Sequence, residues 1–187
     1  MLACSYFQCK KESELDTNKN ITIIVQPFAN FPKSRVTTVV KEIRKIYKNC
    51  KVNPAISFPQ DSWNAEKSRR RADKLIKYLN NLAETDQLYI GLTSEDISTT
   101  KNQYKDWGVF GLGYRPGKSC IASTFRLKGN KDVKLFKVAI HELGHTQGLS
   151  HCPIASCFMR NAKGKDVLDF ETEFCSSCKA VLLQKGW

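Results

Sequence analysis

Long hydrophobic runs are absent from this sequence of 187 residues. No stretch of about eighteen apolar residues occurs, which argues against a transmembrane helix. No internal repeat or low-complexity segment is present either, so nothing indicates a repeat array. The remaining composition, 41% hydrophobic, is typical of a soluble globular protein, and the length is that of one domain with a core of its own.

Acidic residues are scarce relative to basic ones, 18 against 30, and the formal net charge is +12. Such an excess favours acidic partners, nucleic acid or anionic surfaces through long-range steering. The basic residues are scattered, however, and Arg69 to Arg71 form the only tight cluster. Aromatic residues are not interleaved with them on one face, as nucleic-acid binding would require. We therefore expect no nucleic-acid partner and attribute the charge mainly to solubility.

The first residues lack the features of a working signal peptide. They have no basic start and their apolar run is too short, so we expect residues 1–19 to be a disordered leader of a cytoplasmic protein. The alternative is a clipped lipoprotein signal, with Cys4 or Cys9 available for a lipid anchor outside the cytoplasm. Residues 20–187 are expected to form a single domain, and the protein is expected to be a monomer.

Hydrophobic periodicity predicts alternating strands and helices. The expected strands are 21–28, 52–58, 88–92, 107–112 and 120–127, and the expected helices begin at Ser34, at Asp61 or Ser62, and at Gly129 or Asn130. This order predicts an α/β fold in which helices cover a twisted mixed sheet.

Two polar segments interrupt this pattern. Arg69 to Arg71 are expected on the outward side of the second helix, which runs to Leu82. Residues 93–103 are expected to form a polar loop, in which Asp96 is a turn carboxylate or, alternatively, an ion ligand.

All three histidines lie in one motif, HExxHxxGxxH, at His141, His145 and His151. Four residues separate the first two, so on a helix both imidazoles project from one face and can hold one metal ion. Gly148 stands where the helix has to stop, because glycine readily adopts the left-handed turn that redirects the chain. His151 then supplies a third nitrogen, leaving one tetrahedral position of a zinc ion open. The plain alternative for such a histidine pair is a solvated helix face.

Four cysteines follow with the spacing C-x4-C-x17-C-x2-C, at Cys152, Cys157, Cys175 and Cys178. Two short-spaced pairs separated by a loop are typical of a four-thiolate structural zinc site. Two disulfides and a redox-active CxxC remain as alternatives. Two further cysteines, Cys50 and Cys120, are expected to be ordinary buried thiols.

The segments HELGHTQGLSHC, CFM and FCSSC, between residues 138 and 178, strongly resemble the archaemetzincin family of zinc metallopeptidases. The resemblance implies a metzincin-like fold and two zinc ions per chain. It implies His141, His145 and His151 as catalytic-zinc ligands, Glu142 as the catalytic acid/base, and Cys152, Cys157, Cys175 and Cys178 as ligands of a second, structural zinc. Met159 matches the methionine that forms an apolar floor under the metal in metzincins, although ordinary core is the alternative.

These observations predict an upper subdomain, residues 20–148, that carries the active-site helix. Residues 149–187 form a small lower subdomain, too poor in apolar residues to fold without its zinc. The expected activity is hydrolysis of a peptide or protein substrate by a zinc-activated water, with Glu142 transferring the proton. The strand at 120–127 is expected to offer its edge to the substrate. The alternatives are an inactive zinc-stabilised binding protein and a zinc-dependent nucleic-acid-binding module.

Overall fold

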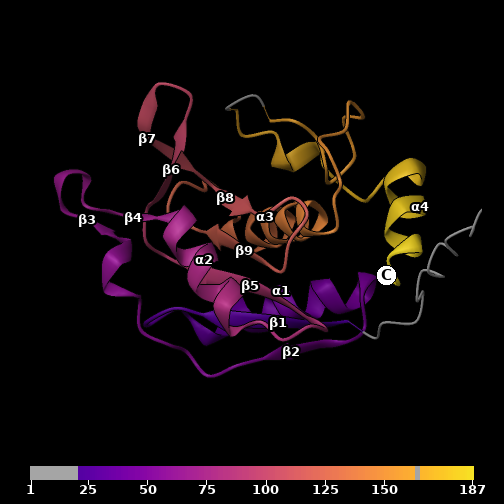
Figure 1. Ribbon diagram of the computed structural model, residues 1–187. Coiled ribbons are helices and arrows are strands. Elements are labelled where there is room, and N and C mark those ends of the chain that lie inside the picture. Colours follow the sequence, from indigo (N-terminus) through magenta and orange to yellow (C-terminus); the bar gives the residue numbers. More distant parts are fainter. Residues whose placement is uncertain (1–20, 163–164) are drawn as a thin grey trace, which may run out of the picture.

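A five-stranded sheet forms the centre of the computed structural model, which describes residues 21–162 and 165–187 (Figure 1). Its order is β2-β1-β5-β9-β8, with neighbours parallel except for the antiparallel β8–β9 pair. The strands are β1 (Thr22–Pro27), β2 (Cys50–Val52), β5 (Gln87–Thr93), β8 (Gly111–Gly113) and β9 (Ser119–Ser123). The predicted α/β fold with a mixed sheet is therefore confirmed.

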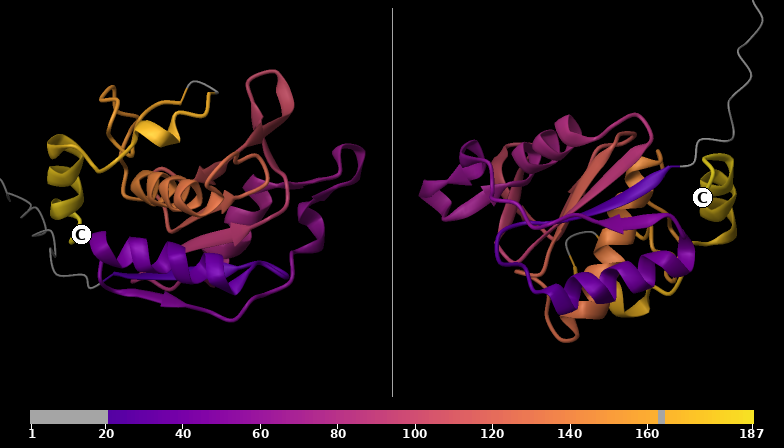
Figure 2. Two further views of the ribbon diagram at one scale, coloured as in Figure 1. Left: turned by 180° about the vertical axis from the view of Figure 1, so that it is seen from behind. Right: turned by 90° about the horizontal axis from the view of Figure 1, so that it is seen from below.

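Helices cover both faces of this sheet. Because successive strand residues point to opposite faces, Ile23 and Val25 of β1 pack with α1 (Lys33–Ile46) and α3 (Lys131–Thr146), while Ile24 packs with α2 (Ala72–Leu82). The view from behind in Figure 2 shows α1 and α3 side by side. The sheet thus holds α3, the helix with the histidine motif, on one face.

A second sheet was missed by the sequence-based prediction. Its order is β3-β4-β6-β7, with β3 (Trp63–Asn64), β4 (Arg69–Arg71), β6 (Ile97–Lys101) and β7 (Tyr104–Val109). Two predictions are therefore wrong: the second helix begins only at Ala72, and residues 93–103 contain a strand. Only two residues separate β6 from β7, and Asn102 takes the left-handed conformation that such a tight hairpin needs. The resulting hairpin projects beside α3 (Figure 1).

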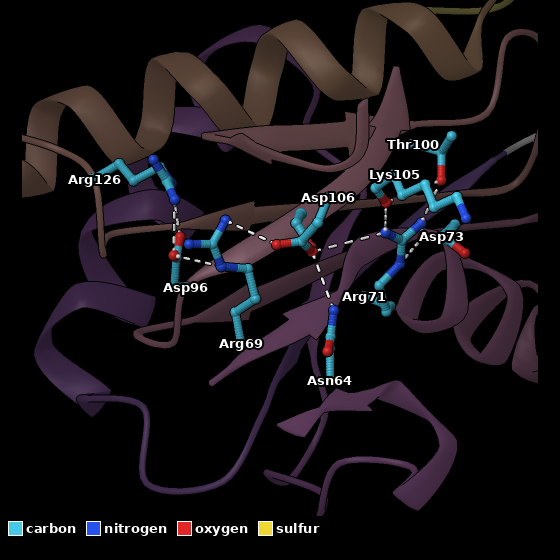
Figure 3. Close-up of polar contacts among 10 residues, drawn as sticks. Asn64, Arg69, Arg71, Asp73, Asp96, Thr100, Lys105, Asp106 and Arg126 are labelled. Carbon is cyan, nitrogen blue, oxygen red and sulfur yellow. Dashed lines mark hydrogen bonds and ion pairs between the residues drawn. The ribbon is translucent and has the colours of Figure 1, made fainter. Parts of the chain in front are cut away.

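The arginines of β4 explain why this segment is not helical. Arg69 forms ion pairs with Asp96 and Asp106, and Arg71 with Asp73 and Asp106, as Figure 3 shows. These guanidinium groups do not point outward as predicted. Half-buried pairing with distant carboxylates outweighs the local helical periodicity, and no local pattern reveals it.

Asp96 is the shared carboxylate of this network. It is 7% exposed and accepts two hydrogen bonds from Arg126, at 2.6 and 2.7 Å, besides its ion pair with Arg69 at 3.2 Å. The protein therefore uses Asp96 as an anchor between β6 and the segment that follows β9. Neither of the two roles considered for Asp96 from the sequence included this pairing.

Other element boundaries differ by a few residues. Helix α1 is capped at Pro32, not at Ser34, and β2 ends at Val52, with only a bridge from Phe28 to Ile56 beyond it. The strand predicted at 107–112 is two strands in different sheets, and β9 ends at Ser123. Asn130 caps α3 as predicted, since its side chain accepts a hydrogen bond from the Val133 N–H.

The segment after α3 returns over this helix and ends in α4 (Ser176–Gln184). Buried residues of the segment, including Phe158, Met159 and Leu182, belong to the same core as α1 and α3, and Trp187 packs against Tyr47 with ring centroids 5.0 Å apart. Among the helices of the described residues, none has the length and apolar character to cross a bilayer. The leader with Cys4 and Cys9 lies outside the described residues, and the division into two subdomains stays a prediction.

We predict that Asp96→Asn lowers the free energy of unfolding by about 3 kcal/mol, because it leaves two guanidinium groups without their buried charge partner. Asp61→Asn is the matched control: Asp61 forms an exposed pair with Lys74 at 3.5 Å, and its loss should cost less than about 1 kcal/mol. Urea unfolding of both variants measures the difference. Equal effects would contradict the anchoring role of Asp96.

Candidate metal centre

The three histidines converge at the end of α3. His141 and His145 lie one turn apart, with ring centroids separated by 4.7 Å, and His151 lies 5.4 and 4.9 Å from them. One ring nitrogen from each lies within 4.8 Å of those of the other two. The predicted set of three imidazole ligands is thus brought together in space.

A Schellman motif at Gly148 produces this convergence. The Gly148 N–H donates to the His145 carbonyl at 2.8 Å, and the Leu149 N–H donates to the Gly144 carbonyl at 3.1 Å. Gly148 has a φ of +90°, and an added Cβ there would meet nothing within 4 Å. The glycine is therefore required by backbone conformation and not by lack of space.

Backbone carbonyls orient the two helical imidazoles. His141 Nδ1 lies 2.6 Å from the Phe158 carbonyl oxygen, and His145 Nδ1 lies 2.7 Å from that of Leu149. A carbonyl can only accept, so each Nδ1 carries the proton and each Nε2 keeps its lone pair for a metal. The donor set thus fits a zinc ion bound by neutral imidazoles.

Burial also keeps these histidines neutral. It lowers the pKa of His141 to about 4, with a further contribution from the nearby His145. Burial likewise lowers the pKa of His145 and of His151, and the positive charge of Arg115 lowers both further. At neutral pH all three side chains are therefore in the protonation state that metal binding requires.

Glu142 is buried beside the histidines, between α3 and the edge strand β8. A Cβ at Gly111 would lie 2.7 Å from Glu142 Cγ, and one at Gly113 would lie 2.9 Å from the Glu142 carbonyl oxygen. The two glycines of β8 therefore make the space in which this carboxyl lies. Burial raises the pKa of Glu142 to about 8, which suits a group that takes up and returns a proton near neutral pH.

Glu142, His141 and His151 line a cavity of about 520 Å³. Residues 107–111, from the end of β7 to the start of β8, form one wall, and Arg160, Asn161, Ala162, Leu168 and Glu171 contribute to the other. Strand β9 pairs with β5 on one side and with β8 on the other. The expectation that the strand at 120–127 offers a free edge is therefore wrong, and β8 is the strand at the edge of the sheet.

Met159 packs against α3 at Gly144, next to His145 in sequence. Its side chain is fully buried, and its sulfur occupies the place where a Cβ at Gly144 would stand, between His141 and His145 in sequence. This position is the one expected for an apolar floor beneath the metal.

The four cysteines form a second cluster. Cys152 and Cys175 have their sulfurs 3.7 Å apart, and those of Cys157 and Cys178 are 3.8 Å apart; all four sulfurs lie within 4.8 Å of one another. Four sulfurs held tetrahedrally at about 2.3 Å from one zinc ion would be about 3.8 Å apart, whereas a disulfide bond is about 2.05 Å long. The cluster therefore fits one zinc ion better than two disulfides.

Cys175 is also the N-cap of α4, a helix start that the sequence did not indicate. The backbone N–H of Cys178 is the main reason why the pKa of Cys175 is lowered, to about 7. A helix N-terminus is one requirement of a redox CxxC, but the convergence of four thiols is not needed for that chemistry. Cys50 and Cys120 lie apart from the cluster as buried free thiols, as predicted.

Several residues that line the cavity were not identified from the sequence: Lys101, Trp107, Arg126, Arg160 and Glu171. Lys101, Trp107 and Arg126 come from segments that precede the histidine motif and share no pattern with it. Arg160 and Glu171 follow Met159 in a segment whose polar residues have no regular spacing. The sequence does offer one signal for this wall of the cavity: Gly111 and Gly113 alternate in a strand, and alternate glycines indicate that another part of the chain approaches the backbone closely.

Comparison with known proteins identifies similar chains. Residues 17–185 match the family model for peptidase family M54. The archaemetzincin of Haloquadratum walsbyi is 27% identical over 173 residues, which cover 84% of this chain and 97% of that protein.

Solved structures give the same result. The crystal structure of archaemetzincin from Methanopyrus kandleri has a TM-score of 0.74 and 25% identity, and the match covers 90% of this chain and 96% of that one. A zinc-dependent peptidase from Methanocorpusculum labreanum, 20% identical, matches in fold with a TM-score of 0.73 over 86% of this chain and 99% of that one.

Glu171, on the cavity wall, is expected to make the stability of the fold depend on pH. It is 2% exposed, its Oε2 has no hydrogen-bond partner among the described residues, and burial raises its pKa to about 7. A carboxyl with a raised pKa contributes stability below its unfolded-state pKa of about 4.5, and this contribution is lost as the pH rises through about 7.

Glu171→Gln should therefore gain stability relative to the parent between pH 5.5 and 8, by about 2 kcal/mol, since one pKa unit corresponds to about 1.4 kcal/mol. Urea unfolding of the zinc-loaded proteins across this range measures the difference. Glu173→Gln, which removes an exposed carboxylate paired with Lys179, should show no such trend. A Glu171→Gln difference that stays constant with pH would contradict the buried, unpartnered carboxyl.

Proposed function

Since this chain belongs to the archaemetzincins of peptidase family M54, we propose that His141, His145 and His151 hold a zinc ion for the hydrolysis of peptide bonds. Membership of the family makes the chain a zinc metallopeptidase. The observation that carries the residue assignment is the convergence of three imidazoles, two with their Nδ1 fixed by carbonyls, on the cavity that also contains Glu142.

Glu142 is proposed as the general acid and base. A zinc ion in this centre supplies a Lewis acid that polarises the scissile carbonyl and makes a water easier to deprotonate. The Glu142 carboxylate accepts the proton of the attacking water and later delivers it to the leaving amine nitrogen. Its burial against β8 restricts the carboxyl to the cavity, so it is positioned before substrate arrives.

The edge strand β8 is proposed to position the substrate. Its free edge can pair with an extended peptide through backbone hydrogen bonds. Because the strand lies against Glu142, a peptide paired with it passes along the proposed catalytic residue.

Cys152, Cys157, Cys175 and Cys178 are proposed to hold a second zinc ion, giving two per chain. Support comes from the sulfur separations of 3.7 and 3.8 Å, which suit a tetrahedral thiolate site. No position is left for a water or a substrate when four thiolates bind one zinc, so the role of this ion is structural. We also propose that the protein acts as a monomer on peptide or protein substrates.

We predict that Glu142→Gln lowers hydrolysis by about 10²- to 10⁴-fold, the usual contribution of a positioned general base. The amide keeps the shape of the side chain, so zinc content and melting temperature should stay at or above the parent values. His151→Ala should instead lose zinc and activity together. Cleavage of a diverse peptide library, followed by mass spectrometry, provides the rates, and unchanged cleavage by Glu142→Gln would rule out its proposed role.

We also predict that Cys178→Ser lowers the melting temperature by about 10 °C or more, because loss of one thiolate weakens a zinc ion whose binding energy is folding energy. Cys120→Ser is the matched control. Cys120 is 0% exposed against 8% for Cys178, and its sulfur, which donates to the Tyr89 carbonyl at 3.6 Å, does not belong to the cluster. Differential scanning calorimetry in reducing buffer compares the two. Equal shifts would argue against a metal bound by the four cysteines.

A further inference from the structure

Basic side chains lie on both walls of the candidate active-site cavity. Lys101 and Arg126 are on the wall formed by the β6–β7 hairpin and the segment after β9, and Arg160 is on the opposite wall, directly after Met159. We propose that this cavity selects acidic peptides, with Lys101 and Arg160 binding carboxylate side chains on the residues next to the scissile bond. This inference rests on the proposed peptidase function and names its substrate class.

Lys101 is a charge without a carboxylate partner. It is the last residue of β6, it is exposed, and its Nζ lies 5.0 Å from the centre of the Trp107 ring. No carboxylate lies within 4.0 Å of this ammonium in residues 21–162 and 165–187. Lys101 lines the same cavity as the proposed metal ligand His151 and the proposed catalytic residue Glu142. A substrate carboxylate near the scissile bond would therefore be within its range.

Arg160 has the same character on the other wall. Its guanidinium lies 5.7 Å from the centre of the Phe170 ring and donates a long hydrogen bond, 3.5 Å, to the Ala155 carbonyl. Within the described part of the chain it has no ion pair. An arginine held over an aromatic ring keeps its planar set of donors available for a carboxylate.

Arg126 differs because its charge is already compensated. Its Nε and Nη2 bind both oxygens of Asp96, which Arg69 also contacts, and Figure 3 shows this chain of alternating charges continuing through Asp106 to Arg71. Arg126 is therefore a fixed hydrogen-bond donor at the cavity wall. The selectivity is assigned to the two unpaired cations.

The acidic residues of the cavity do not cancel these charges. Glu142 is used for proton transfer in the proposed mechanism. Glu171 is 2% exposed, and burial raises its pKa to about 7 although the charges of Lys137 and Arg160 act against this rise, so it compensates Arg160 only in part at neutral pH. The net charge of +12 for the whole chain further steers anionic peptides toward the protein.

The test uses zinc-loaded full-length protein and a library of blocked octapeptides read by mass spectrometry. Cleaved peptides should be enriched about 3- to 10-fold in Asp and Glu at positions flanking the cleaved bond, the range expected for partly exposed ion pairs. Lys101→Met and Arg160→Met should each reduce kcat/KM about 5-fold for a Glu-containing peptide and less than 2-fold for its Gln counterpart.

Lys105→Met is the matched control. Lys105 is an exposed lysine of the same hairpin that does not line the cavity, so its replacement changes the net charge equally and should leave the Glu-to-Gln ratio unchanged. Raising the salt concentration from 50 to 500 mM should reduce the ratio in the parent. Cleavage without acidic enrichment, or enrichment unaffected by both cavity variants, would overturn the proposal.

A binding measurement separates this proposal from the proposed catalysis. Fluorescence anisotropy with a labelled Glu-containing octapeptide and its Gln counterpart needs no cleavage. Tighter binding of the Glu peptide that depends on Lys101 and Arg160 would support the selection of acidic peptides even if no peptide is cleaved. Binding without cleavage would count against the peptidase mechanism alone. Equal binding of both peptides would overturn the proposed selectivity for acidic peptides.

Discussion

The hydrogen bond between His141 Nδ1 and the Phe158 carbonyl is the interaction on which the rest of the site depends. It fixes the imidazole tautomer, and it ties α3 to the segment that returns over it. Cys157 precedes Phe158 and Met159 follows it, so one short stretch of backbone orients a proposed catalytic ligand, supplies a proposed structural ligand and carries the methionine proposed as the apolar floor. On the other side, His151 and Cys152 are adjacent in sequence. The two proposed zinc centres therefore share their supporting backbone.

This arrangement explains why a small segment is sufficient to complete the site. Residues after Gly148 add a few buried apolar side chains to the core of α1 and α3, among them Phe158, Phe174 and Leu182. The Phe158 carbonyl stays within hydrogen-bond distance of the His141 imidazole only if the loop that carries it is fixed. A metal ion bound by the four converging thiols would fix this loop. The proposed structural centre would thus act on catalysis through the position of Phe158.

The two clusters of possible metal ligands were predictable from the sequence because the information for them is local. HExxHxxGxxH lies within eleven residues, and Gly148 and Asn130 mark the ends of the helix by backbone conformation and capping. The β6–β7 hairpin was not predictable in the same way. Its strands are polar, so hydrophobic alternation does not mark them. The neighbouring strand β4, Arg69 to Arg71, is held by ion pairs with Asp96 and Asp106, which lie far along the chain and leave no local pattern. The cavity walls, including Lys101, Arg126 and Glu171, depend on these distant pairings.

Zinc K-edge X-ray absorption on the reduced, zinc-saturated protein tests the central claim most directly, because it reports the atoms bound to the metal. We expect two shells of nearly equal weight, sulfur at about 2.3 Å and nitrogen or oxygen at about 2.0–2.1 Å, from one four-thiolate and one three-imidazole centre. A spectrum without a sulfur shell would contradict the account, because the cysteine cluster would then hold no metal and could not fix the loop that orients His141.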